Sequence, residues 1–82
     1  MLPAWISPRG LQEHCLAGGL LTLVLHGMNA APTVIVVAVL AMAVAHEIGD
    51  GDLQRTAPGW PWNGLLDVFA FLPLPLLHWI LT

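Results

Sequence analysis

Charged residues are scarce in this chain. Only 9% of its 82 residues are charged, and the two arginines, Arg9 and Arg55, are its only basic residues. A typical soluble domain has about 25% charged residues, and a short chain needs polar side chains to cover a relatively large surface. The charges also avoid two long tracts, residues 16–45 and 68–82. Composition and charge placement therefore indicate burial in lipid or inside a larger complex.

Two further shortages exclude other classes of protein. The net charge of -3 and the lack of a basic patch exclude nucleic-acid binding, which needs cations to neutralise phosphates. Cys15 is the only cysteine, so an internal disulfide and a cysteine-based zinc site are excluded as well. Tyrosine is absent, but tryptophan occurs four times. Because tryptophan favours membrane interfaces, four interface anchors are predicted: Trp5, Trp60, Trp62 and Trp79.

Apolar sequence is abundant and falls into three segments. Each segment is uninterrupted enough to favour a helix, and glycine, proline, asparagine and aspartate crowd the connections. The predicted elements are a helix over 11–28, a turn at 29–32, a helix over 32–48, a loop at 49–63 and a helix over 64–81.

Local signals predict where these helices begin, bend and end. Asn29 and Asn63 are expected to act as N-caps of the second and third helices. Gly49 is expected to end the second helix. Pro73 and Pro75 are expected to kink the third helix, because proline has no backbone N–H.

The first ten residues are predicted to be an irregular lead-in, because they contain two prolines that favour extended geometry before them. Arg9 and the apolar run 15–25 also fit a secretory signal peptide. The basic end of such a signal is poor here, since Glu13 offsets the single arginine, and we expect no cleavage.

The fold class predicted from these features is all-α: one membrane domain, 1–82, with three short transmembrane helices running up, down and up. Three spans put Arg9 and Arg55 on one side, which the positive-inside rule places in the cytoplasm, with the C-terminus outside. Spans of about 16 to 18 residues reach about 24 to 27 Å, against a hydrocarbon core of about 30 Å, which favours oligomerisation or local thinning. The alternatives are a re-entrant helical hairpin over 11–46 with one spanning helix, and a soluble helical bundle.

Small residues recur at helical spacing in the first two helices. Gly18 and Thr22 share a face of the first helix, and Ala38, Ala41 and Ala45 share a face of the second. Small side chains let two helices approach closely within a bilayer. These five residues are therefore the predicted helix-contact positions.

Polar side chains gather where the second helix ends and the third begins. An acid one turn into an apolar segment is expensive unless it is paired or lies near the interface, so Asp67 is expected to pair with Arg55 or His46. The predicted polar boundary cluster consists of His46, Glu47, Asp50, Arg55 and Asp67. His26 and His78 are expected to be polar residues at the opposite interface.

A metal site is a lesser alternative for this cluster. His46-Glu47-x-x-Asp50 lacks the second histidine of the zincin motif, and the boundary cluster is read first as a solvated helix end. A composite site of His14, His46, Asp50 and Asp67 is geometrically allowed. We predict no metal, cofactor or catalytic residue, because no nucleophile with its base, phosphate loop or cofactor motif is visible.

The second half of the chain carries two short patterns, an E-I-x-x-x-D stretch after an apolar helix and a W-N-x-x-x-D entry into the last one. The residues that match are Glu47, Ile48, Asp52, Trp62, Asn63 and Asp67. With its tryptophan-rich loop, this half resembles small membrane proteins encoded by tailed bacteriophages. Some members of that group are holins, which oligomerise into membrane lesions that release or activate a lysis enzyme.

The leading functional prediction is a self-associating, non-enzymatic, holin-like protein of a bacterial or host inner membrane. Its expected partners are the lipid bilayer and further copies of itself. The first alternative is an accessory structural subunit of a larger membrane complex. The second is a metal-dependent membrane enzyme, which requires His46, Glu47, Asp50 and Asp67 to converge.

Overall fold

Four helices and no strand make up the described part of the chain. The computed structural model describes residues 5–51, 54, 56 and 59–82. The helices are α1 (Pro8–Gly27), α2 (Pro32–Asp50), α3 (Trp62–Ala70) and α4 (Pro73–Leu81). The all-α prediction is confirmed.

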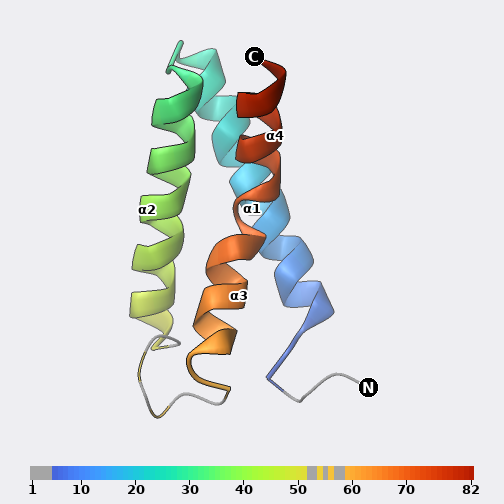
Figure 1. Cartoon of the computed structure of the whole chain (residues 1–82), viewed down its shortest axis with the longest axis vertical. Helices are drawn as coiled ribbons and strands as arrows, with labels where there is room; N and C mark the ends of the chain where they lie inside the picture. The colour runs from blue at the N-terminus through green and yellow to red at the C-terminus, as the bar shows by residue number, and fades with distance from the viewer. Residues whose placement is uncertain (1–4, 52–53, 55, 57–58) are drawn as a thin grey trace.

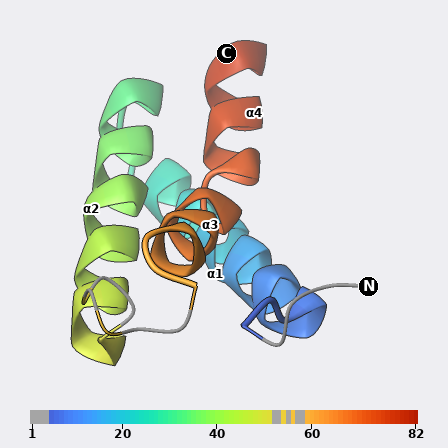
Figure 2. The same ribbon diagram turned by 60° about the horizontal axis from the view of Figure 1, so that its bottom comes forward.

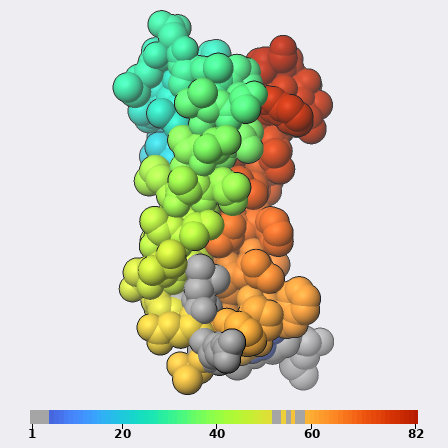
Figure 3. All heavy atoms as spheres, turned by 60° about the vertical axis from the view of Figure 1, so that its left-hand side comes forward, coloured from blue at the N-terminus to red at the C-terminus, as the bar shows by residue number. Residues whose placement is uncertain are grey.

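The helices form three antiparallel rods in an elongated molecule that measures 39 × 24 × 17 Å. α1 and α2 are one rod each, and α3 followed by α4 forms the third (Figure 1). The turn between α1 and α2 and the end of α4 lie together at what we call the upper end. The starts of α1 and α3 and the end of α2 lie at the lower end (Figures 1 and 2). α2 and the α3–α4 rod lie side by side along the length of the molecule (Figure 3).

α1 begins three residues earlier than the sequence analysis predicts. Ser7 is its N-cap, and the Ser7 Oγ accepts a hydrogen bond of 3.1 Å from the Gly10 backbone N–H. Pro8 occupies the first helical position, where its missing N–H and fixed φ are well suited to starting a helix. The predicted irregular lead-in therefore stops before Pro8.

α2 continues past Gly49, so the prediction that this glycine ends the helix is wrong. The helix ends at Asp50, and Gly51 follows in the left-handed conformation with φ 78°. A glycine in that conformation closes many helices, because it has no Cβ to clash. As a result, His46 and Asp50 lie one turn apart on a helix.

Neither predicted asparagine N-cap is found. Asn29 lies in the turn with φ 65°, a left-handed conformation that asparagine tolerates, and Ala31 precedes α2 without a side-chain cap. Asn63 lies inside α3, and its Oδ1 accepts a hydrogen bond of 2.7 Å from the Gly64 N–H.

The predicted kink in the last segment is a complete break. α3 ends at Ala70, α4 begins at Pro73, and the two axes differ by 43°. Pro73 cannot donate a backbone hydrogen bond, so the helical ladder is interrupted just before it. The single helix predicted over 64–81 is therefore two helices, with the half-buried Phe71 at the bend between them.

The core is a narrow stripe. Ile35, Val39 and Ala43 are fully buried along one face of α2, at the four-residue spacing that places side chains above one another on a helix. Leu72 joins Ile35 and Val39 in the core cluster. Large apolar side chains are nevertheless exposed on all four helices, among them Leu16, Leu23, Val34, Val37, Met42, Leu65, Phe69, Leu77 and Ile80. Soluble monomers seldom expose so much contiguous apolar surface.

Among the described residues, α2 is the one helix that is long and apolar enough to cross a membrane alone. Only 22% of its most apolar stretch is buried, unlike the core helix of a globular protein. α3 and α4 meet the same standard together, as a broken span or a re-entrant pair. α1 does not, because Gln12, Glu13 and His14 interrupt its apolar sequence. The three-span arrangement stays a prediction.

Candidate functional site

Three side chains with metal-ligating atoms meet between α1 and α2 at the lower end of the molecule. His14 comes from the second turn of α1, and His46 and Glu47 come from the last turns of α2. Each offers one ligand atom, and these atoms all lie within 4.8 Å of one another. The antiparallel packing of two helices therefore creates a cluster that no local stretch of sequence contains.

The ring of His14 is held by backbone on one side and faces a carboxylate on the other. Its Nδ1 lies 2.7 Å from the Gly10 carbonyl oxygen. A carbonyl oxygen only accepts, so Nδ1 carries a proton and donates it. Nε2 lies 3.2 Å from Oε1 of Glu47. This second nitrogen is therefore the ring atom that faces the carboxylate and is placed to bind a cation between the two groups.

Glu47 is the one charged side chain that is fully buried among the described residues. It continues the core stripe of α2, one turn after Ala43. A carboxylate is placed in such surroundings only when it is paired or coordinates a metal, because losing its hydration is expensive. The side chain of His14, 19% exposed, meets it there.

His46 completes the cluster from a more open position. Its side chain is 49% exposed, and its Nε2 lies 3.1 Å from Oδ2 of Asp50, one turn further along α2. The His14 and His46 rings are edge to face, with centroids 5.4 Å apart. Asp50 is therefore placed to orient the His46 ring.

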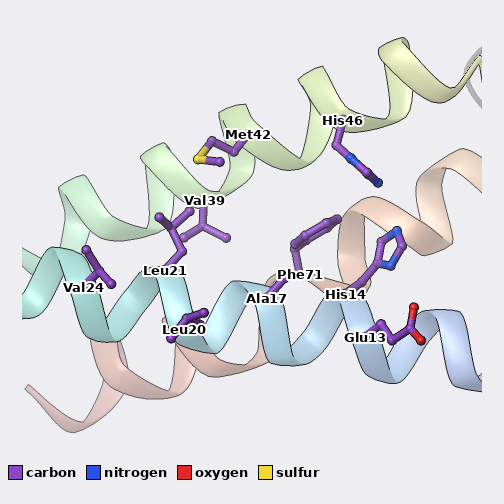
Figure 4. A pocket seen from close by; sticks show the side chains of 10 residues that line it. All are labelled: Glu13, His14, Ala17, Leu20, Leu21, Val24, Val39, Met42, His46 and Phe71. Carbon is purple, nitrogen blue, oxygen red and sulfur yellow. The ribbon is translucent and has the colours of Figure 1, made fainter.

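Phe71 connects this cluster to the third rod. Its ring centroid lies 4.6 Å from that of His14 and 5.8 Å from that of His46. The two histidines approach from α1 and α2, and Phe71, which follows α3, lies beside both of them (Figure 4). The break between α3 and α4 thus places an aromatic ring against both imidazoles.

A cavity of about 560 Å³ runs from the two histidines along the groove between α1 and α2. Glu13, His14 and His46 give it a polar end (Figure 4). Towards the upper end its walls are apolar, with Leu20, Leu21, Val24, Val39 and Met42. Such a cavity fits an amphiphilic chain better than a polar solute, because most of its wall cannot form hydrogen bonds.

The predicted small face of α1 makes its contacts inside the molecule. Gly18 and Thr22 are both buried, and the Thr22 hydroxyl donates a hydrogen bond of 2.7 Å to the Gly18 carbonyl oxygen. A Cβ at Gly18 would overlap the backbone carbonyl of Phe71. Gly18 therefore allows α1 to approach the backbone of the α3–α4 bend.

The predicted small face of α2 makes no such contact. Ala41 and Ala45 are exposed and Ala38 is half-buried, because the core stripe occupies the other side of this helix. Ala38, Ala41 and three neighbouring side chains line a shallow groove of about 290 Å³. We call Ala38, Ala41 and Ala45 the alanine face.

Three of the four predicted interface tryptophans lie at the lower end, and Trp79 lies near the upper end. Trp60, Trp62 and Trp79 are exposed. Trp5 is half-buried, and its indole ring covers Gly59. The tryptophans therefore mark the two ends of the molecule.

The predicted polar boundary cluster is divided by the structure. Arg55 lies outside the described residues. Asp67 is half-buried in α3, but its carboxylate is not one of the ligand atoms that gather around His14. Arg9 forms an exposed ion pair of 3.6 Å with Glu13.

Two histidines that the sequence analysis treats as separate interface residues meet at the upper end. His78 Nε2 lies 3.3 Å from His26 Nδ1, with the ring centroids 5.0 Å apart. Glu47 belongs to the residues predicted for a metal-dependent enzyme, but not to the predicted composite site of His14, His46, Asp50 and Asp67. Glu47 follows Ile35 by three steps of four residues, and this helical spacing is the signal that could have placed Glu47 on the core face of α2.

No protein-family model, curated protein or solved structure matches the chain. Its function is therefore inferred from its own side chains and their geometry.

Proposed function

We propose that the protein is a small multi-pass membrane protein that self-associates through α2 and permeabilises the bilayer, as holins do. The observation that carries this proposal is the alanine face, which is apolar, built of small side chains and turned away from the other helices. In this proposal the protein acts as an assembly and not as an enzyme.

The apolar surface supports lipid as the surroundings of the helices. Large aliphatic and aromatic side chains are exposed on every helix, and a helix that is apolar all round is stable only when protein or lipid covers it. The molecule is 39 Å long, compared with about 30 Å for a hydrocarbon core. All three rods then cross the bilayer, the third as the bent α3–α4 pair.

The alanine face supports a second copy of α2 as its occupant. Within lipid, helices associate where small side chains let their backbones approach, since apolar burial alone provides no driving force there. The shallow groove beside Ala38 and Ala41 has the shape that a facing helix requires. Two copies that pack along this face leave the core stripe and the His14 cluster inside each chain.

In the proposed orientation the lower end lies at the cytoplasmic interface of a bacterial inner membrane. Arg9, Trp60 and Trp62 lie at this end, and basic residues and tryptophans are enriched at such an interface. The C-terminus then lies outside, and Trp79 lies close to the outer interface.

Crosslinking and lysis together test the proposal. The full chain is expressed in a bacterium, its oligomers are measured by crosslinking in membranes, and culture density is followed over time. Ala41→Leu and Ala45→Leu should each abolish the oligomers and delay lysis, because the added side chain holds the helices apart. Gly27→Leu is the matched control, since it places the same side chain at an exposed position of α1 with open space around it and should leave both readouts unchanged.

The outcome that contradicts the proposal is equally specific. A wild-type chain that remains monomeric in membranes and leaves the culture intact would rule out self-association as its function. Recovery of that chain only with a larger membrane complex would instead support the role of accessory subunit.

A further inference from the structure

We propose that His14, His46 and Glu47 form a zinc site that clamps α1 to α2 at the lower end of the molecule. The inference rests on three side chains and their immediate neighbours, and it does not depend on the proposed holin-like function. Two imidazole nitrogens and one carboxylate oxygen form a donor set that suits Zn²⁺.

The spacing of the donor atoms fits a tetrahedral ion. With Zn–N and Zn–O bonds of about 2.0 to 2.1 Å, two ligand atoms of a tetrahedral site lie about 3.3 Å apart. His14 Nε2 and Glu47 Oε1 are already 3.2 Å apart. The ring nitrogen of His46 lies within 4.8 Å of both. The gap that remains to a tetrahedral spacing is therefore at most about 1.5 Å, and the His46 side chain that would close it is half-exposed.

The surroundings of His14 are those of a metal ligand. Its Nδ1 donates to the Gly10 carbonyl oxygen at 2.7 Å, which fixes the ring and leaves Nε2 to face Glu47. Histidines that bind metals are commonly held in this way, with the second nitrogen bonded to a carbonyl or carboxylate oxygen. Phe71 packs against the same ring and further restricts its rotation.

Charge balance also favours a cation between these groups. Glu47 is fully buried, and a Zn²⁺ ion held by Glu47 and two neutral imidazoles leaves one net positive charge. Asp50, beside His46, offsets that charge and can orient the His46 ring. Water is the fourth ligand, because three protein ligands leave one position open.

A cobalt titration tests the site directly. The purified full chain in detergent is stripped of metal with a chelator and titrated with Co²⁺, whose visible absorption reports tetrahedral coordination, and Zn²⁺ is then used to displace it. We expect one ion per chain. His14→Ala, His46→Ala and Glu47→Gln should each weaken binding by at least about 10- to 100-fold, the loss produced even by changes outside the ligands themselves.

The His26–His78 pair supplies the matched control, since its two rings are also in contact but lie at the opposite end. His26→Ala should leave cobalt and zinc binding unchanged. His46→Ala also keeps the test valid if His14→Ala fails to fold, because the His46 side chain is half-exposed. Circular dichroism verifies the helix content of each variant.

Two results would overturn the proposal. Absence of metal binding at micromolar concentration, together with a stability loss in Glu47→Gln, would identify a plain ion pair between His14 and Glu47. Binding that persists in both His14→Ala and His46→Ala, or that disappears in His26→Ala, would place the ion elsewhere. Both results are obtained on detergent-solubilised chains, so neither depends on whether the protein forms oligomers or lyses cells.

Discussion

Nε2 of His14 and Oε1 of Glu47 lie 3.2 Å apart although 33 positions separate the residues in the chain. This contact is a polar connection between α1 and α2 in an interface that is otherwise mostly apolar. Apolar side chains allow two helices to slide, because many alignments bury similar area. A buried carboxylate facing an imidazole favours one alignment, since moving α1 by one turn would separate them. The pair therefore sets the register of the two helices.

The first prediction concerns the strength of this contact. His14→Ala and Glu47→Gln should each lower the free energy of unfolding by about 1 to 3 kcal/mol, the usual effect of disrupting a buried hydrogen-bonded group. The double variant should lose less than the sum of the two, with a coupling energy of about 0.5 to 3 kcal/mol. Unfolding of the metal-free chain in mixed detergent, followed by circular dichroism, provides these values.

His26→Ala is the control for that cycle, because His26 is exposed and lies at the other end of the molecule. Combined with Glu47→Gln, it should give additive losses. Additive losses for His14→Ala with Glu47→Gln would contradict the prediction and show that the two side chains do not interact.

The second prediction concerns Gly18. Its Cβ position is occupied by the backbone carbonyl of Phe71, which cannot rotate away as a side chain can. Gly18→Ala should therefore lower stability by about 1 to 3 kcal/mol through overpacking, although alanine is the better helix former by about 1 kcal/mol. The same detergent unfolding assay measures the loss.

Two other glycines of α1 calibrate this result. Gly27 has open space at its Cβ position, so Gly27→Ala should be neutral or slightly stabilising. At Gly19 the obstacle is the end of the flexible Leu74 side chain, so Gly19→Ala should fall between the two. A Gly18→Ala variant as stable as Gly27→Ala would mean that α1 does not approach the α3–α4 bend this closely.

The third prediction concerns Phe71, whose ring contacts both His14 and His46. Phe71→Leu keeps an apolar side chain at the bend but removes the aromatic contacts, which are worth about 0.5 to 1.5 kcal/mol beyond area burial. We expect that loss of stability and a weaker affinity for Co²⁺, because the His14 ring gains rotational freedom. Phe69→Leu, at an exposed aromatic residue of α3, is the control. An unchanged cobalt affinity in Phe71→Leu would show that the aromatic ring does not help to hold the imidazoles.

Local rules were sufficient for the order of the helices and for the bend. Three apolar segments predict three rods, and prolines without an N–H predict a kink in the last of them; the structure has three rods, and the last is broken into α3 and α4. The helix ends were predicted less well because several residues compete to form each cap. Ser7 starts α1 before Leu11, and Gly51 closes α2 although Gly49 comes first in the sequence. Which residue forms the cap depends on the backbone conformation over the whole turn, and single-residue preferences do not determine that conformation.

The cluster was predicted in part. His14 and His46 were paired in a composite metal site with Asp50 and Asp67, whereas Glu47 was named only among the residues of a metal-dependent enzyme. α2 offers two stripes with helical spacing, the alanine face and the stripe that runs from Ile35 to Glu47. Sequence alone cannot determine which stripe faces α1, because that depends on how α3 and α4 fill the remaining space. Once the bulkier stripe is buried, Glu47 necessarily points inward beside His14.

The last prediction concerns the two ends of the molecule in a bilayer. Trp62 begins α3 at the lower end, and Trp79 lies near the end of α4 at the upper end (Figure 1). In the proposed three-span arrangement each indole lies at an interface, where tryptophan is favoured, and the two occupy opposite leaflets. Variants that retain only one of these tryptophans, with the others changed to phenylalanine, are reconstituted in vesicles and quenched with brominated lipids.

Both fluorophores should be quenched most by bromine near the headgroups and least by bromine at the chain ends. A water-soluble quencher added outside sealed, uniformly oriented vesicles should reach only one of them. Similar access to both from outside would mean that α3 and α4 turn back within one leaflet, which is the re-entrant arrangement. The 43° bend permits either path, so the length of the third rod does not decide between them. The leaflet that Trp79 occupies distinguishes the two paths, because a crossing rod and a re-entrant rod leave Trp79 on opposite sides of the bilayer.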